Sequence, residues 1–115
     1  MTIAEVIVVA SDAAFRHSLV FVLESGDFQV LPYCTLDAAL ASTRHYGECA
    51  VIDEEVISDR EHAKKLIRIF ARPVILLVDN TRTFPDVDMV RYLTKPFLGE
   101  PLLRAVYEAV ADPDT

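Results

Sequence analysis

The sequence predicts a doubly wound α/β domain, a parallel sheet with helices on both faces. Two observations support this prediction. Short runs such as VILLV (74–78) are apolar throughout, whereas a strand with one solvated face would alternate. These runs also alternate with stretches of helical periodicity, which implies parallel strands joined by right-handed crossovers. The 115 residues, 52% of them hydrophobic, suit one compact domain spanning residues 1–115.

The first half of the chain is expected to hold three strands and two helices. Side chains of Ser, Asp and Thr accept hydrogen bonds from the first N–H groups of a helix, and glycine is common where a helix ends. The expected elements are a strand at 5–10, a helix that starts after Ser11 and Asp12 and ends at Gly26, a strand at 28–30, a helix capped by Thr35, and a strand at 49–52.

The second half continues the same alternation. Apolar residues at helical spacing predict a helix at 60–70, and Pro73 stops it before the strand at 74–78. The segment 79–89 has no helical stripe and contains Pro85, so we expect a loop or a single turn there, with the fourth helix short or absent. A strand at 90–94 and an amphipathic helix at 100–110 complete the domain.

Composition excludes several classes of function. Eighteen acidic against eleven basic residues give a net charge of −7, which repels nucleic acid and anionic membrane surfaces. The apolar runs are too short to span a bilayer, and no basic segment precedes the first of them. We therefore expect a soluble, cytoplasmic protein. Cys34 and Cys49 show no metal-binding spacing and are expected to be reduced thiols, without a zinc site.

The chemistry of such a fold lies outside the carboxyl ends of its strands. Asp53 ends the third apolar run and Lys95 ends the fifth. The two side chains should therefore meet, either as an ion pair or as a cation beside a reactive carboxylate. Glu54 and Glu55 follow Asp53, and consecutive residues point in different directions. At least one of them should face solvent, and Glu55 is a candidate for the crevice.

Four segments resemble the receiver domain of two-component response regulators, namely VVASDAAFR, AVIDEEV, PVILLVDN and RYLTKPF. The resemblance implies a five-stranded sheet of order 2-1-3-4-5. It places Asp53 at the phosphoacceptor position and Lys95 at the lysine that contacts the phosphoryl group. Tyr92 falls at the aromatic position whose rotamer reports the signalling state, although it could equally be a packing residue.

The chain departs from the receiver pattern where that family holds magnesium. The acidic pair of the family falls on Ala10 and Ser11, which have no carboxylate. Asp12 lies one residue further along and suits a helix cap better than a metal ligand, so Asp12 and Asp53 are weak metal candidates. Val78 stands where the family has a small hydroxyl residue. No cofactor is expected, and Mg²⁺ enters only if Asp53 is a working phosphoacceptor.

Two functions follow from this comparison. The first is an atypical pseudo-receiver that signals by protein–protein interaction, with weak or no magnesium-dependent phosphorylation. The alternative is a working receiver that is phosphorylated on Asp53 by a histidine kinase. The only enzymatic activity in either case would be self-phosphorylation. A third option, an aspartate-nucleophile phosphatase, needs a second carboxylate that Glu55 supplies only loosely. The expected partner is a histidine kinase or another signalling protein, with homodimerisation as a further option.

Overall fold

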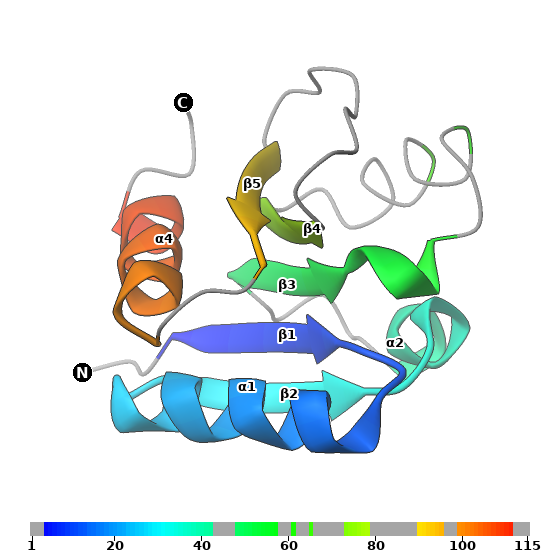
Figure 1. Ribbon diagram of the computed structural model, residues 1–115, viewed down its shortest axis with the longest axis horizontal. Coiled ribbons are helices and arrows are strands. Elements are labelled where there is room, and N and C mark those ends of the chain that lie inside the picture. Colours follow the sequence, from blue (N-terminus) through cyan, green and yellow to red (C-terminus); the bar gives the residue numbers. More distant parts are fainter. Residues whose placement is uncertain are drawn as a thin grey trace.

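The computed structural model describes residues 4–42, 48–57, 61, 65, 73–78, 90–95 and 99–111. Its centre is a five-stranded sheet of order β2-β1-β3-β4-β5, in which every neighbouring pair is parallel (Figure 1). The strands are β1 (Glu5–Val9), β2 (Gln29–Tyr33), β3 (Cys49–Asp53), β4 (Val74–Val78) and β5 (Val90–Thr94). The predicted fold class and strand order are confirmed.

Helices cover both faces of this sheet. They are α1 (Ala13–Ser25), α2 (Leu36–Ser42) and α4 (Gly99–Ala111), and a short 3-10 turn, η1 (Glu54–Val56), follows β3. In Figure 1, α1 and α4 lie on one face and α2 lies towards the other. The expected helix at 60–70 falls largely outside the described residues, although Glu61 and Lys65 are helical. The segment 79–89, with its short or absent fourth helix, lies outside them altogether.

The central strands are buried because each contributes side chains to both apolar layers. All five residues of β3 and all five of β4 are buried. One layer lies under α1 and α4 and includes Val8, Leu19, Val51, Leu77 and Val106. The other lies on the α2 side and includes Val9, Leu36, Ile52, Leu76 and Val78. This two-sided burial is the reason that the strands read as unbroken apolar runs.

The helix starts follow the predicted capping residues. The Phe15 N–H donates to Asp12 Oδ2 at 2.8 Å, which makes Asp12 the N-cap of α1. The Ala38 N–H donates to Thr35 Oγ1 at 3.0 Å at the start of α2. Each contact satisfies one of the amide donors that a helix leaves unpaired in its first turn.

Gly26 ends α1 as predicted, but its backbone does not adopt the left-handed conformation. Its φ is −93°, and Asp27 is the residue with positive φ, at 68°. The close neighbour is α4, because a Cβ at this position would lie 2.5 Å from Leu103 Cδ2 and the end of that side chain would have to shift. The Tyr107 hydroxyl also donates to the Gly26 carbonyl at 2.8 Å. Gly26 therefore allows α1 and α4 to approach closely.

Strand β2 starts one residue later and ends three residues further along than the sequence predicts. Phe28 is buried just before the strand, and Pro32 lies inside it and is exposed. A proline is tolerated because β2 is an edge strand. The Gln29 N–H donates to the Ala4 carbonyl in the direction of β1, so by strand alternation the nitrogen of Pro32 faces the open edge.

Candidate functional site

The candidate site lies at the carboxyl ends of β3, β4 and β5. Asp53 is the last residue of β3, and Lys95 follows the last residue of β5. The Lys95 Nζ lies 2.7 Å from Asp53 Oδ1, which is an ion pair with hydrogen-bond geometry. The Asp53 side chain is 2% exposed and the Lys95 side chain is 18% exposed. The two residues that the sequence expects to meet are thus in direct contact.

Strand pairing explains how lysine reaches a strand that is not its neighbour. Because β4 lies between β3 and β5, Lys95 must cross the end of β4. The Lys95 N–H donates to the Val78 carbonyl at 2.8 Å, which continues the ladder past the end of β5. This bond fixes the backbone from which the flexible lysine stem extends to Asp53.

A ring from α1 completes the surroundings of the ammonium group. The Lys95 Nζ lies 5.2 Å from the centroid of the Phe15 ring, within the range of a cation–π contact. Phe15 is half-buried and packs against the apolar layer under α1 and α4. The Lys95 ammonium therefore has a carboxylate and an aromatic ring as neighbours. The sequence predicts the carboxylate but gave no reason to single out the ring.

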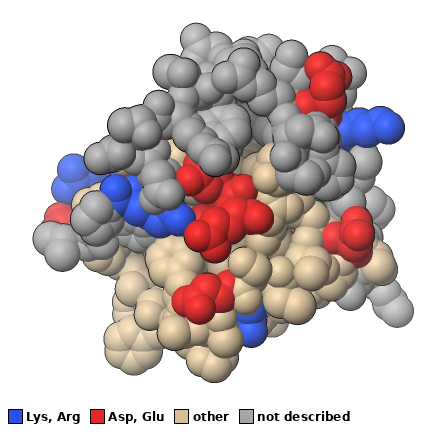
Figure 2. All heavy atoms as spheres, turned by 45° about the vertical axis from the view of Figure 1, so that its right-hand side comes forward, with Lys and Arg blue, Asp and Glu red and all other residues tan. Residues whose placement is uncertain are grey.

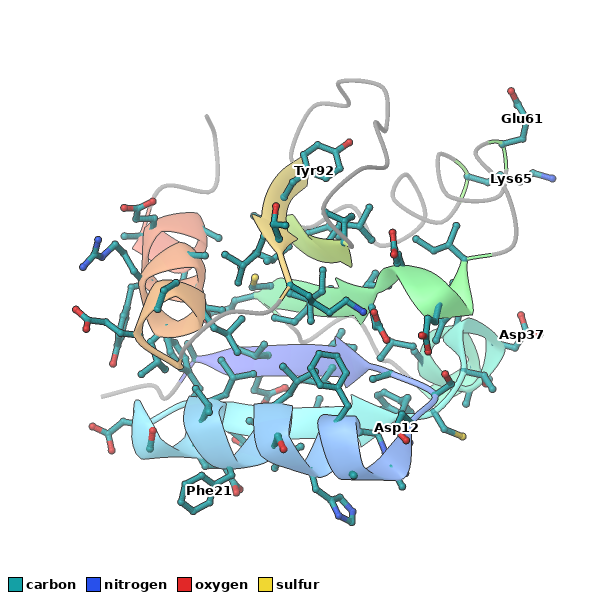
Figure 3. The ribbon with its side chains drawn as sticks, in the orientation of Figure 1. Asp12, Phe21, Asp37, Glu61, Lys65 and Tyr92 are labelled. Carbon is teal, nitrogen blue, oxygen red and sulfur yellow. The ribbon has the colours of Figure 1, made fainter. Side chains whose placement is uncertain are left out.

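The turn between β1 and α1 is held by its own side chains. The Arg16 Nη1 donates to the Ala10 carbonyl at 2.9 Å and to the Ser11 carbonyl at 3.4 Å. The carboxylate of Asp12 accepts from the first turn of α1, and Figure 3 shows this residue at the start of that helix. The acid nearest to the turn is thus engaged as a helix cap, the role that its sequence position favours.

The two glutamates after Asp53 differ sharply in burial. Glu54 is buried, at 5% exposed, whereas Glu55 is exposed. One of the pair faces solvent, as expected, but Glu54 rather than Glu55 is the acid that is buried next to Asp53. The reason is η1, which turns the chain immediately after β3. In Figure 2, acidic atoms gather at the centre of the molecular face and meet basic atoms there.

Val78 and Tyr92 occupy different environments. Val78 is 5% exposed and belongs to the apolar layer on the α2 side of the sheet. Tyr92 is 38% exposed and projects outward from β5 in Figure 3. Its assignment as a signalling-state residue stays a prediction.

The donor set of the described residues does not fit a magnesium ion. Magnesium is held through oxygen ligands, chiefly carboxylates. Ala10 and Ser11 lack them, Asp53 Oδ1 is bonded to Lys95, and Asp12 Oδ2 is bonded to the Phe15 amide. Within the described parts of the chain, no group of three or more His, Cys, Asp or Glu gathers as metal ligands. Of the two cysteines, Cys34 is exposed and Cys49 is buried.

A search of the described helices finds none that is long and apolar enough to cross a membrane.

The strand order, with a buried aspartate at the end of β3 in contact with a lysine after β5, is that of a CheY-like receiver domain. No family model matches the sequence. The chain is 33% identical over 107 residues to the transcriptional regulator protein FixT of Rhizobium meliloti (strain 1021), covering 91% of each chain. It belongs to the response regulator receiver family of two-component signalling.

Solved structures show the same fold. A CheY-like receiver domain protein from Methanospirillum hungatei JF-1 aligns with a TM-score of 0.76 at 17% identity and covers 96% of both chains. The Vibrio cholerae chemotaxis protein CheY4 aligns with a TM-score of 0.76 at 21% identity, covering 94% of this chain and 99% of that one. At these identities the likeness extends to the fold alone.

Proposed function

We propose that this chain is an atypical receiver that signals by binding a histidine kinase or another signalling protein, with little or no magnesium-dependent phosphorylation. The observation that carries the proposal is that Ala10 and Ser11, directly after β1, have no carboxylate to hold a metal ion, while Asp53 is paired with Lys95 at 2.7 Å. This pairing gives the buried carboxylate a cationic partner from within the chain. The pair then acts as a fixed contact between β3 and β5 rather than as a phosphorylation site.

Charge arguments support this assignment. Phosphoryl transfer depends on positioning and on neutralising charge at the transferring oxygens, where a metal ion is ordinarily central. A phosphoryl group on Asp53 would bring close to two negative charges, and Lys95 supplies one positive charge. Two unit charges at about 4 Å interact by roughly 4 kcal/mol at an effective dielectric of about 20. Lys95 alone is therefore a weak substitute for a divalent ion.

The side chains around Asp53 also disfavour its phosphorylation. The buried acid next to it, Glu54, adds negative charge rather than compensating it. Val78 has no hydroxyl to donate to a phosphoryl oxygen. These side chains supply neither the charge nor the hydrogen bonds that a phosphorylated aspartate requires.

The related protein of Rhizobium meliloti is named a transcriptional regulator. We assign this chain a similar regulatory role, exerted through protein contacts in the cytoplasm by a single domain spanning residues 1–115. The net charge of −7 disfavours direct contact with DNA. The two cysteines, Cys34 and Cys49, have no metal-binding spacing in the sequence and suit reduced thiols in a reducing compartment.

A working phosphoacceptor is the second candidate. It is favoured by the position of Asp53, which ends β3 next to a lysine, as a receiver requires. Under this alternative, a weakly bound Mg²⁺ would compete with Lys95 for the Asp53 carboxylate, and Asp53 would accept a phosphoryl group from a histidine kinase.

Intact-mass measurement separates the two candidates. The protein is incubated with a small-molecule phosphodonor, with and without Mg²⁺, beside a conventional receiver as positive control and Asp53→Asn as negative control. We expect the mass of the wild-type protein to stay unchanged under conditions that modify the conventional receiver. A magnesium-dependent gain of one phosphoryl group that is absent from Asp53→Asn would overturn the proposal.

A variant with two added carboxylates tests whether their absence from the turn after β1 is what prevents phosphorylation. Ala10→Asp combined with Ser11→Asp returns two carboxylates to the turn after β1. Provided that circular dichroism shows a folded protein, we expect this variant to gain the phosphoryl mass in Mg²⁺. If it folds but stays unmodified, the missing carboxylates are not the cause.

A further inference from the structure

The Lys95 ammonium carries three N–H bonds. One points to Asp53 Oδ1 at 2.7 Å, and the Phe15 ring lies 5.2 Å from the nitrogen. The negative face of an aromatic ring attracts a cation more strongly where water is largely excluded, and the Lys95 side chain is only 18% exposed. Phe15 thus lies where it can stabilise the charged form of the lysine in the crevice.

The first turn of α1 restricts where this ring can lie. The Phe15 N–H is held by the Asp12 carboxylate, and the next residue, Arg16, binds the Ala10 and Ser11 carbonyls. Phe15 is therefore flanked by residues that fix both the helix start and the turn before it. Packing against the apolar layer under α1 and α4 restricts the ring further.

We propose that Phe15 is a positioning residue for Lys95: its ring holds the ammonium group against Asp53 and so limits the access of other groups to that carboxylate. This inference deepens the proposed function, because a lysine that left Asp53 readily would leave the carboxylate open. Phe15 acts through Lys95 and does not itself touch Asp53 in this role.

The plain alternative is that Phe15 only fills the core. Leucine would serve that purpose nearly as well, since it is apolar and buries a similar surface, but it has no ring. Tyrosine keeps the ring and its negative face. Phe15→Leu and Phe15→Tyr therefore separate a positioning role from simple packing.

Nuclear magnetic resonance of labelled lysine side chains gives the readout. The chain has three lysines, Lys64, Lys65 and Lys95, so Lys64→Arg and Lys65→Arg assign the signals by elimination. We expect the Lys95 Hε protons to be shifted upfield by the ring current in the wild type and in Phe15→Tyr, but not in Phe15→Leu. Exchange of the Lys95 Nζ protons with water should be about two- to thirty-fold faster in Phe15→Leu, the range expected for the loss of a cation–π contact.

Two outcomes overturn the inference. One is an unchanged Lys95 signal and exchange rate in Phe15→Leu, which would mean that the ring does not act on the lysine. The other is an equal loss of the upfield shift and an equal rise in the exchange rate in Phe15→Leu and Phe15→Tyr, which would indicate a packing role. If Phe15→Leu does not fold, Phe15→Met provides a second ringless variant. The result is independent of the mass measurement, because a phosphorylated wild type with an intact ring-current shift would reject the proposed function and keep the contact.

Discussion

The Lys95 Nζ reaches over the end of β4 to lie 2.7 Å from Asp53 Oδ1, and this ion pair joins two strands that are not hydrogen-bonded to each other. The pair is unequal in its exposure to water. The Asp53 side chain is almost fully buried, whereas solvent still reaches Lys95. Loss of the lysine should therefore cost more stability than loss of the acid.

Lys95→Met tests this asymmetry. The substitution leaves the Asp53 carboxylate buried without its cation, and we expect a loss of about 3 kcal/mol in the free energy of unfolding, at the low end for broken buried pairs. Asp53→Asn should cost about 1–2 kcal/mol, because Lys95 stays partly hydrated. Urea unfolding measures both losses. The double variant should lose at least about 1 kcal/mol less than the sum of the two; strict additivity would show that the residues are not coupled.

Asp12→Ala tests the role of that carboxylate. Removal of the cap from the Phe15 amide should lower the free energy of unfolding by about 1 kcal/mol. Asp12→Ser keeps a capping oxygen without a carboxylate, and it should stay within about 0.5 kcal/mol of the wild type. Thermal unfolding compares the two variants. A loss in Asp12→Ser as large as that in Asp12→Ala would show that the charge matters rather than the cap.

Gly26→Ala tests the close approach of α1 and α4. The new Cβ would lie 2.5 Å from Leu103 Cδ2, so we expect overpacking that costs about 1–3 kcal/mol. The backbone itself tolerates alanine, since the φ of Gly26 is −93°. Leu103→Ala removes the clashing methyl group and serves as the second mutation of a cycle. Gly26→Ala should cost markedly less in that background, and an unchanged cost would rule out the clash as its origin.

Tyr107→Phe removes one hydrogen bond from the same junction. Its hydroxyl donates to the Gly26 carbonyl at 2.8 Å, and its ring packs 4.9 Å from that of Phe28. The variant keeps the ring contact and should lose about 1 kcal/mol of unfolding free energy. Tyr33→Phe removes a hydroxyl from β2 and is the matched control. Equal losses of unfolding free energy in both variants would mean that the hydrogen bond to Gly26 does not itself stabilise the fold.

Most of the fold follows from local patterns in the sequence. The apolar runs at 74–78 and 49–52 indicate strands buried on both faces, and the caps Asp12 and Thr35 mark helix starts to within a residue. The end of β2 was missed because Pro32 reads as a strand breaker unless the strand is known to be at an edge. Edge position is a property of the whole sheet, so no local pattern reports it.

The candidate site is predictable in part for the same reason. Asp53 and Lys95 stand at the ends of strands, and parallel topology alone brings such positions together. The Phe15 contact depends on how α1 lies over the crevice, and the burial of Glu54 depends on the η1 turn. Both are tertiary features that residue types and spacing do not encode.

Pro32 has a consequence for self-association. Its nitrogen faces the open edge of β2 and carries no proton, so a strand added there would lack a donor in the middle of its ladder. This edge is therefore protected against strand addition and against the templated growth of fibrils. Any assembly of copies that extends the sheet would have to use the β5 edge instead.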